Sequence, residues 1–358
     1  MGRISWQRPY FASPMLHLLE QTSEQLQGWM AERNQPRYRA AQVRRWLFDN
    51  AVAQFDEMTD LAKPLRAQLA EEFSIWTTRV AVHRKARDGT EKLLLELADG
   101  NRIECVLLRD DKDHRTMCLS TQVGCAMGCV FCASGLAGAV RNLTTGEIVE
   151  QMLQLRRLLP PGERPSHIVM MGMGEPLLNL DRLLPALQIA TSPDGLGIGA
   201  RRTTISTVGI PKGIRRLAEM NCQYHLAVSL HAPNEELRSR IVPTNRKIGI
   251  GAILEAADEY FEKTGRRVMF EYVLLREMND QAEHAAELAL LLKGRPSLVN
   301  LIPYNPVDGL PYRTPAPAST ARFVKILERA GLSVAVRWRK GDRIGAACGQ
   351  LRLAVSGA

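Results

Sequence analysis

The sequence lacks two features that would place the protein in or beyond a membrane. No apolar run among its 358 residues is long enough to cross a bilayer. Its first residues, MGRISWQRPYFASPML, lack the cationic start, apolar stretch and small-residue cleavage site of a secretory signal. No low-complexity tract is present either. These absences predict a cytoplasmic protein that does not insert into a membrane.

What the sequence does contain is ordinary for a globular protein, apart from its charge. Hydrophobic residues make up 45% and charged residues 24%, and the length allows one large domain or a main domain with a smaller one attached. The net charge of +9 is consistent with a polyanionic partner such as nucleic acid. Charge alone leaves this open, because many basic proteins bind no nucleic acid.

Residues 1–75 are predicted to form a helical, basic accessory domain. The stretch QPRYRAAQVRRWLF places Ala41, Arg44, Arg45 and Phe48 at helical spacing, with a tyrosine and a tryptophan among the arginines. Arginines meet phosphates and aromatic rings stack on bases, so an RNA-contacting module is one interpretation. A small helical bundle with a solvated charged face is the other. The sequence does not separate the two.

Residues 76–112 are predicted to form a short antiparallel sheet that leads into the main domain. Three strand-like runs, WTTRVAVHRKA, KLLLELAD and NRIECVLLR, are separated by the pairs Asp88-Gly89 and Asp99-Gly100. Asp-Gly between alternating apolar residues is a strong hairpin signal.

Residues 113–350 alternate between strand-like and helix-like stretches. Six strand–helix units follow one another, which favours a parallel sheet with flanking helices. A closed barrel of this kind has eight units, so six units fit an open, incomplete (β/α)6 barrel or a doubly wound sheet.

Unusual residues stand where these predicted strands end, and in such folds ligands gather at the carboxyl ends of the strands. They are Cys125, Cys129 and Cys132 after the first strand, Gly172, Gly174 and Glu175 after the second, Ser206 at the third, Ser229 and His231 at the fourth, and Asn305 after the sixth. We therefore expect one active site at this face. The pairs Arg201–Arg202 and Arg215–Arg216 and the stretch 338–343 are expected to hold RNA phosphates near it or to be solvated surface.

Three of the seven cysteines lie within the eight residues CAMGCVFC. In a reducing compartment, clustered cysteines more often bind metal or do chemistry than form disulfides. A structural zinc site uses four ligands, whereas Cys125, Cys129 and Cys132 are three, with no histidine nearby. Three thiolates leave one iron of a [4Fe–4S] cube without a protein ligand, which is useful if a substrate or cosubstrate takes that iron.

The pattern C-x3-C-x-aromatic-C, with Phe131 as the aromatic residue, resembles the signature of radical S-adenosylmethionine (SAM) enzymes. This resemblance implies a [4Fe–4S] cluster on the three cysteines, with SAM on the open iron as the source of a 5′-deoxyadenosyl radical. The stretch MGMGEP does not fit a dinucleotide loop, because no third glycine follows at the right distance. It is similar to the glycine–glutamate motif that meets the SAM amino group in this superfamily.

A narrower resemblance covers about Tyr38 to Leu351. The segments CLSTQVGCAMGCVFCASG, MGMGEPLLN, LAVSLHAPN, IVPTNRK, NLIPYNP and AACGQL, in this order, resemble the RlmN family of adenosine carbon-2 methyltransferases. The resemblance implies methylation of 23S ribosomal RNA and, in some members, of tRNA. The related Cfr family, which methylates carbon 8, is the enzymatic alternative. An inert RNA-binding protein with a structural Fe–S cluster is the alternative from another class.

Three further residues receive roles from the same resemblance. Carbon 2 of adenine is not nucleophilic, so a methyl group must first be held on the protein. Cys348 would take that methyl from one of two SAM molecules used per turnover, and a radical on it would then link RNA to protein. Cys118 would release the product and leave a disulfide with Cys348, a step that requires a thiolate. Glu104 would accept the proton from the ring, a role that Cys118 could share.

The resemblance also implies a set of SAM contacts, together with an electron donor of the flavodoxin type and a monomeric state. The predicted contacts are Gly174, Glu175, Ser206, Ser229, Leu230, His231 and Asn305. A satisfied histidine at a strand end and local capping serines are the structural alternatives for three of them. Burial without chemistry is the expectation for Cys105 and Cys222.

Overall fold

The computed structural model describes residues 15–110, 112–136, 138–220, 222–337, 341 and 344–351. Its contacts divide the chain into two compact units, with the boundary between Thr77 and Thr78. In the described part of the chain, no helix has the length and apolar character needed to cross a membrane.

The N-terminal unit is a small helical bundle, as its sequence predicts. It contains α1 (Ser23–Glu32), α2 (Tyr38–Phe48) and α3 (Lys63–Glu72), the short 3-10 helices η1 (Leu18–Glu20) and η2 (Phe55–Glu57), and a parallel pair of strands, β1 (Leu16–His17) and β2 (Phe73–Ser74). The side chain of Thr22 accepts a hydrogen bond from the Gln25 backbone and so caps α1. Leu26, Met30 and Leu69 are among its buried apolar residues.

Some of the basic and aromatic side chains of α2 bind partners within this unit. Arg45 Nη2 lies 2.5 Å from Asp60 Oδ2, and Trp46 Nε1 donates to Asp60 Oδ1 at 2.5 Å. Tyr38, in contrast, is 59% exposed, with the guanidinium of Arg39 over its ring. Internal pairing and an exposed basic–aromatic surface therefore coexist on one helix.

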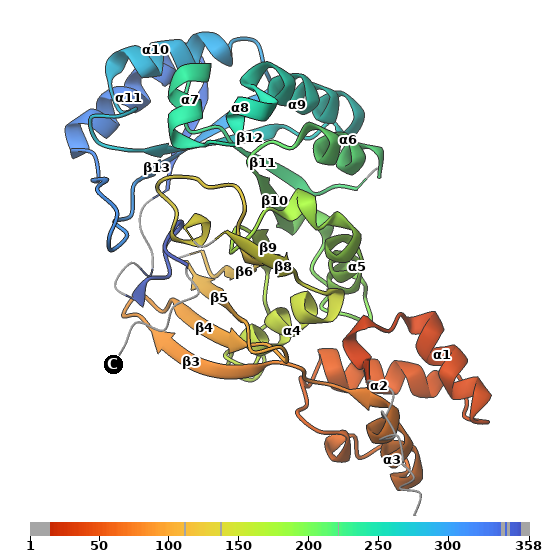
Figure 1. Cartoon of the computed structure of the whole chain (residues 1–358). Helices are drawn as coiled ribbons and strands as arrows, with labels where there is room; N and C mark the ends of the chain where they lie inside the picture. Colours follow the sequence, from red (N-terminus) through yellow and green to blue (C-terminus); the bar gives the residue numbers. More distant parts are fainter. Residues whose placement is uncertain are drawn as a thin grey trace, which may run out of the picture. The chain divides into compact units, whose positions relative to one another are not determined.

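The second unit is built on one ten-stranded sheet, shown in Figure 1. Its spatial order is β14-β13-β12-β11-β10-β9-β6-β5-β4-β3. The strands are β3 (Arg79–Lys85), β4 (Glu91–Glu96), β5 (Arg102–Arg109), β6 (Arg115–Cys118), β9 (His167–Met170), β10 (Thr203–Thr207), β11 (His225–Ser229), β12 (Val268–Leu274), β13 (Ser297–Pro303) and β14 (Ser333–Val336).

Two halves of different topology meet at β6 in this sheet. From β6 through β9 to β14 every neighbouring pair is parallel, whereas β3, β4, β5 and β6 pair antiparallel. The predicted α/β fold with six strand–helix units is confirmed, and β14 adds a seventh parallel strand that the sequence did not suggest. The antiparallel strands continue the main sheet because β6 serves both halves. The division of the sequence at residues 75 and 112 stays a prediction.

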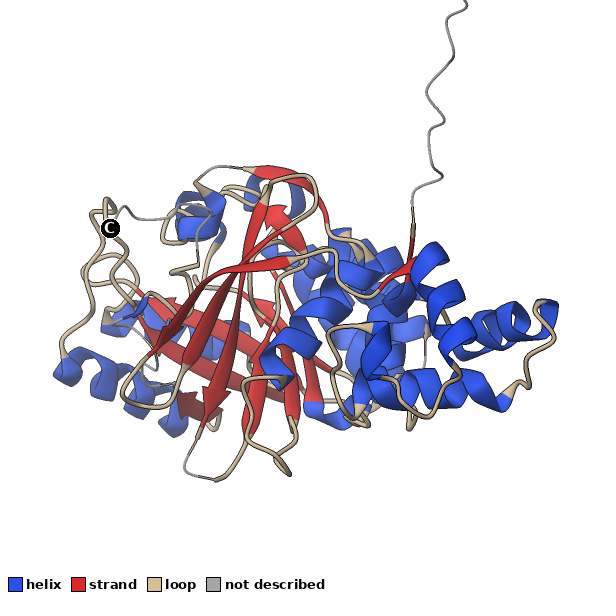
Figure 2. Cartoon of the chain, turned by 90° about the horizontal axis from the view of Figure 1, so that it is seen from below, coloured by secondary structure: helices blue, strands red, loops and turns tan. Residues whose placement is uncertain are grey.

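Helices cover the outer side of the curved parallel sheet (Figures 1 and 2). They are α4 (Thr145–Arg156), α5 (Leu180–Thr191), α6 (Pro211–Glu219), α9 (Ile250–Thr264), α10 (Ala282–Leu291) and α11 (Pro317–Arg329). The shorter helices α7 (Glu235–Ile241) and α8 (Asn245–Ile248) follow β11, and α7 packs against the segment 127–131. The 3-10 turns η3 (Ala133–Gly135), η4 (Pro176–Leu178) and η5 (Ala200–Arg202) lie in connections between these elements. Strands buried on both faces are typically near-continuous apolar runs, and β11 and β12 follow this rule. The exceptions are therefore informative, and Glu271 in β12 is one.

Candidate active site

The three clustered cysteines lie on a loop that is fixed from three sides. The loop connects β7 (Gln122–Gly124) to β8 (Ala139–Asn142), which pair antiparallel, and it includes η3. The Cys125 amide donates to the Gly138 carbonyl at 2.9 Å, and the Val130 amide donates to the last residue of α7 at 3.1 Å. The Ala133 amide donates to the carbonyl of Gly349 at 2.8 Å, which ties the loop to the C-terminal segment.

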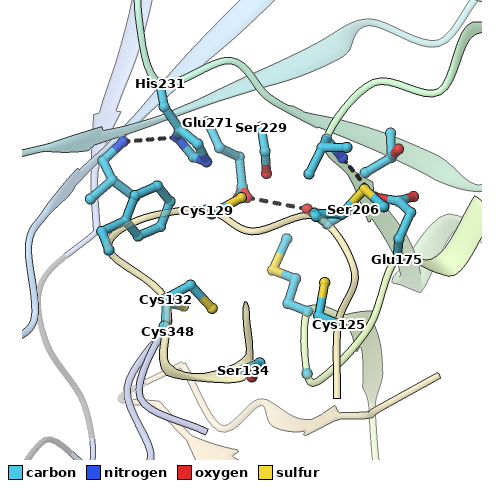
Figure 3. Close-up of a pocket in the computed structure, with 18 of the residues that line it drawn as sticks. Cys125, Cys129, Cys132, Ser134, Glu175, Ser206, Ser229, His231, Glu271 and Cys348 are labelled. Atoms are coloured by element: carbon cyan, nitrogen blue, oxygen red, sulfur yellow. Dashed lines mark hydrogen bonds between the residues drawn. The ribbon is translucent and has the colours of Figure 1, made fainter. Parts of the chain in front are cut away.

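All three cysteines line a cavity of about 130 Å³ at the carboxyl ends of the parallel strands (Figure 3). Within the described residues, no three Cys, His, Asp or Glu side chains are close enough together to hold a single metal ion. A zinc ion would draw its thiolates to within about 4 Å of one another, since each Zn–S bond is about 2.3 Å long. A cubane spreads its thiolates further, because each thiolate binds a different iron. The three cysteines can supply one ligand to each of three irons of a cubane, whereas a structural zinc site uses four ligands.

Burial makes the three thiols poor acids on their own. It raises the pKa of Cys125 to about 11, and it raises the pKa values of Cys129 and Cys132 as well. Thiolates that ligated iron at these positions would therefore have to be stabilised by the cationic metal itself.

The MGMGEP turn brings Glu175 into this cavity through close backbone packing. A Cβ atom at Gly172 would lie 2.6 Å from the backbone of Leu119, and one at Gly174, where φ is +103°, would lie 2.6 Å from Gln122. Both glycines are thus required by the segment that leads from β6 to the cysteine loop. Glu175 follows, and its amide donates to the side chain of Gln122 at 2.8 Å.

The carboxylate of Glu175 is buried and only partly compensated. Its Oε1 accepts from the Leu177 amide at 3.0 Å and its Oε2 from the Val208 amide at 2.8 Å. Burial nevertheless raises the pKa of Glu175 to about 7. A cationic ligand in the cavity would favour the ionised form.

The strand ends add a row of polar side chains on the inner face of the sheet. The register pairs Ser229 with Glu271 and Glu271 with Asn300. The hydroxyl of Ser206 donates to Glu271 Oε2 at 3.3 Å, the contact drawn as a dashed line in Figure 3. Sequence analysis missed Glu271, although a lone carboxylate in the run RVMFEYVLL marks a position that an apolar core does not explain.

His231 lies beside the cysteine loop in a fixed, neutral form. Its φ of +60° is unusual for a residue other than glycine. Its Nδ1 accepts from the Val273 amide at 3.1 Å, its ring packs edge-on against Phe131 at 4.9 Å, and burial lowers its pKa to about 3. The remaining proton therefore sits on Nε2, which is a donor. The neighbouring Leu230 does not line the cavity; its amide donates to the Glu271 carbonyl and its carbonyl accepts from Arg238.

Asn305 supplies a buried polar atom to which a ligand could bind. Its Nδ2 donates to the Cys348 carbonyl at 3.1 Å. Its Oδ1 is buried and has no hydrogen-bond partner. A buried acceptor without a partner is costly, so a donor group of a bound molecule fits this position. The cysteines, Glu175 and Asn305 together are compatible with a [4Fe–4S] cluster and a cationic, hydrogen-bonding cosubstrate.

A second cavity of about 640 Å³ lies on the other side of Cys348. The two cavities share Met171, Ile302, Asn305 and Cys348 in their linings. Cys118, at the end of β6, and Arg337, after β14, line the second one. The structure thus brings together two cysteines that are 230 residues apart in the sequence.

Arg337 is a cation beside both of these thiols, and sequence analysis missed it. Its Nη1 donates to the Met171 sulfur at 3.4 Å. The charges of Cys348, Glu271 and Cys118 raise its pKa. Burial raises the pKa of Cys118 to about 12, and the charge of Cys348 adds to this effect, whereas Arg337 opposes it.

Glu104 lies on the same face of the sheet as Cys118 but lines neither cavity. In the ladder, Val106 of β5 pairs with both Lys92 and Cys118, and Glu104 follows two residues away on that face. Lys92 Nζ lies 2.7 Å from Glu104 Oε1 and also donates to the Gly345 carbonyl at 2.9 Å. Lys92 thereby joins Glu104 to the segment that carries Cys348.

The remaining predicted residues are not at the site. Arg201 and Arg202 precede β10 and so lie at the amino end of the sheet, away from the cavities. Arg215 and Arg216 on α6 pair with Glu259 and Asp181, respectively. Of the stretch 338–343, only Gly341 is among the described residues. Cys105 is buried and Cys222 half-buried, and neither lines the cavities.

Comparison with known proteins matches both units of the chain. Residues 119–289 match the radical SAM superfamily, whose members use a [4Fe–4S] cluster and SAM, and residues 16–75 match the ribosomal RNA large subunit methyltransferase N-terminal domain.

Individual relatives match nearly the whole chain. A probable dual-specificity RNA methyltransferase RlmN of Rhodopirellula baltica is 61% identical over 336 residues, covering 94% of this chain and 90% of the relative. One from Symbiobacterium thermophilum is 48% identical, covering 92% and 89%. The crystal structure of a radical SAM methyltransferase from Sphaerobacter thermophilus superposes with a TM-score of 0.92 at 43% identity, covering 95% of this chain and 100% of that chain. With both units matched and 61% identity along almost its full length, the chain belongs to the RlmN family of radical SAM RNA methyltransferases.

Proposed function

We propose that the protein methylates carbon 2 of an adenosine in 23S ribosomal RNA and, as a second substrate, in tRNA. The observation that carries this proposal is the convergence of Cys118, Cys348 and Arg337 on the larger cavity, with Cys348 lining the smaller cavity as well. RNA binding or SAM cleavage alone needs no such thiol pair. The relatives named dual-specificity RNA methyltransferases support the choice of two RNA substrates.

Cys125, Cys129 and Cys132 would hold the cluster in the smaller cavity. Glu175 would receive the SAM amino group, and Asn305 Oδ1 would accept a hydrogen bond from the same molecule. Around them stand the other proposed contacts, namely Gly174, Ser206, Ser229 and His231. The predicted contact with Leu230 is not retained, because this residue does not line the cavity and its amide and carbonyl bond to Glu271 and Arg238. When bound, the cluster and SAM supply a carbon radical that can take hydrogen from an S-methyl group.

Cys348 would carry the methyl group, and its position suits this task because it faces both cavities. Its thiolate takes the methyl from the SAM sulfonium by displacement, forming a thioether on the protein. Arg337 places a cation near this sulfur, since the two groups interact electrostatically. The S-methyl carbon then faces the larger cavity, where a nucleotide has room.

Cys118 would end the cycle. In the covalent adduct, the methylene carbon links Cys348 to carbon 2 of the adenine. Once the adduct has given its unpaired electron to a one-electron acceptor and lost the ring proton, the Cys118 thiolate would attack the Cys348 sulfur. The S–C bond breaks with its electron pair on the methylene carbon, which takes up a proton to become the methyl group, and a disulfide forms as the methylated base departs. A thiol reductant must supply two electrons to restore both cysteines. Glu104, held by Lys92, would accept the ring proton, a role open to Cys118 as well.

Three further parts of the proposal concern the setting of the reaction. We propose a flavodoxin-type electron donor, a monomeric protein and a cytoplasmic location. A reducing compartment suits thiols that must alternate between free and disulfide-bonded forms.

Nucleoside mass spectrometry tests the proposal. RNA from cells with and without the gene is digested, and methyladenosine isomers are separated. We expect 2-methyladenosine in 23S ribosomal RNA and tRNA only when the protein is present. The 8-methyl isomer would instead identify a Cfr-like enzyme, and no change in either isomer would contradict methyltransferase activity.

A further inference from the structure

Arg238 is a fully buried cation behind the cysteine loop. It lies on α7 and is 1% exposed. Its Nε donates to the Leu230 carbonyl at 3.0 Å, and its Nη2 donates to the carbonyls of Val208 at 2.5 Å and Ser229 at 3.1 Å. Its Nη1 donates to Asn245 Oδ1 at 2.5 Å. Every one of these acceptors is a neutral oxygen.

Among the described residues, the guanidinium is therefore hydrogen-bonded to neutral oxygens and has no carboxylate in direct contact. Burial lowers the pKa of Arg238 to about 10, so it remains a cation at neutral pH. Among the charges that favour this cation, the Cys129 thiolate comes first and Glu235 second. The Glu235 carboxylate is one layer away, because its Oε2 accepts from Asn245 Nδ2 at 2.7 Å. A buried cation is costly without an anion nearby, and Cys129 would supply one as a thiolate ligand of a cluster.

Apolar residues fill the space between α7 and the loop. Met127 and Phe131 of the loop pack in one cluster with Leu237, Ile241 and Val242. The loop is also pinned to this region, since the Thr244 hydroxyl donates to the Met127 carbonyl at 3.1 Å. Arg238 itself is 1% exposed, so its charge is screened far less than that of a surface arginine.

We propose that Arg238 is the fixed counter-charge of the cluster held by Cys125, Cys129 and Cys132, and that it raises the reduction potential of that cluster. The inference rests on the proposed function of the three cysteines. One-electron reduction by a flavodoxin-type donor adds one negative charge to the cluster. A cation that is already in place and cannot move stabilises the reduced state more than the oxidised state. Arg238 acts through Cys129 and does not touch the reacting atoms, so it is a positioning residue.

The carbonyls of Val208, Ser229 and Leu230 give Arg238 a structural role as well, because they end strands β10 and β11. The test must therefore separate charge from shape. Arg238→Gln removes the charge, and Arg238→Lys keeps it. Glu235→Gln provides a change of opposite sign, because it removes the competing anion and leaves one oxygen that can accept from Asn245, at the cost of the bond that Glu235 Oε1 accepts from the Ile250 amide at 2.6 Å.

The experiment is an anaerobic redox titration of full-length reconstituted protein, with the reduced cluster followed by electron paramagnetic resonance. For Arg238→Gln we expect at least a tenfold weaker reduction equilibrium, which is a midpoint about 59 mV more negative for one electron. Arg238→Lys is expected to shift the midpoint by less, and Glu235→Gln to shift it to more positive potentials. Iron and sulfide per chain are measured on every sample.

Unchanged midpoints in the loaded variants, or a shift of Glu235→Gln in the same direction as Arg238→Gln, would overturn the inference. If Arg238→Gln fails to fold, the direction of the Glu235→Gln shift still decides. A wild-type protein that takes up no cluster would instead contradict the proposed function itself.

Discussion

The two cavities on either side of Cys348 differ in size and in how their walls are held. The cysteine cavity, about 130 Å³, is enclosed by strand ends and by buried groups such as Glu175 and His231 whose hydrogen bonds fix them. The larger cavity, about 640 Å³, is bordered by the turn between β5 and β6, including the paired Asp110 and His114. A small, rigid site suits a resident cofactor. A roomier site suits a larger group, such as a nucleotide of the RNA.

The largest expected effect concerns the smaller cavity. Cys129→Ala removes one of the three proposed iron ligands and is expected to lower bound iron to background and abolish methylation. Chemical iron analysis and the electron paramagnetic resonance signal after anaerobic reconstitution measure this. Cys222→Ala is the matched control, because Cys222 lies outside both cavities and should retain full iron. Normal iron in Cys129→Ala would mean that the cavity does not hold the cluster in the way proposed.

A second prediction separates the two cysteines that border the larger cavity. Cys118→Ala is expected to accumulate a covalent protein–RNA adduct, since the thiol that releases the product is gone. Cys348→Ala is expected to form none, since the methyl carrier is gone. Denaturing gels with labelled RNA and intact-protein mass spectrometry report the adduct. Turnover by either variant would contradict the roles assigned to this pair.

A third prediction tests whether the larger cavity activates its thiols electrostatically. Burial raises the pKa of Cys118 to about 12 and Arg337 lowers it, so Arg337→Met should raise that pKa further. Each unit of increase leaves about tenfold less thiolate at a given pH below the pKa. Release of the adduct should slow about tenfold or more, and alkylation of Cys118 should shift to higher pH. Arg337→Lys keeps the charge and should recover part of the rate; equal alkylation profiles in all three proteins would refute the role.

The smallest expected effect is the pH dependence of SAM binding in the smaller cavity. Because burial raises the pKa of Glu175 to about 7, its carboxyl is mostly neutral at pH 6 and mostly ionised at pH 8. The ionised form attracts the SAM ammonium, so affinity should be about tenfold higher at pH 8 than at pH 6. Anaerobic calorimetry measures it. Glu175→Gln should bind weakly at both values, and a variant that keeps the pH dependence would assign it to another group.

The sequence predicted local features of the site better than features that depend on distant pairing. The three cysteines and Glu175 could be identified in the sequence, because their spacing or their position after a predicted strand marks them. Arg337 was not, because one arginine near a basic stretch carries no pattern, and only the strand order brings it next to Cys118. The same holds for Lys92, whose partner Glu104 is on a neighbouring strand. The placement of Arg201–Arg202 near the site was wrong, because those residues enter β10 rather than leave it.

The ties between the C-terminal segment and the cysteine loop have one more consequence. The Ala133 amide donates to the Gly349 carbonyl, and the Ser134 hydroxyl donates to the Leu351 carbonyl at 2.6 Å. These bonds hold the main chain just after Cys348, and the Asn305 side chain donates to the Cys348 carbonyl. The main chain that carries the Cys348 sulfur is therefore hydrogen-bonded to the cysteine loop. Rotation of the Cys348 side chain can move the sulfur a short way, whereas a larger displacement requires these backbone hydrogen bonds to break first.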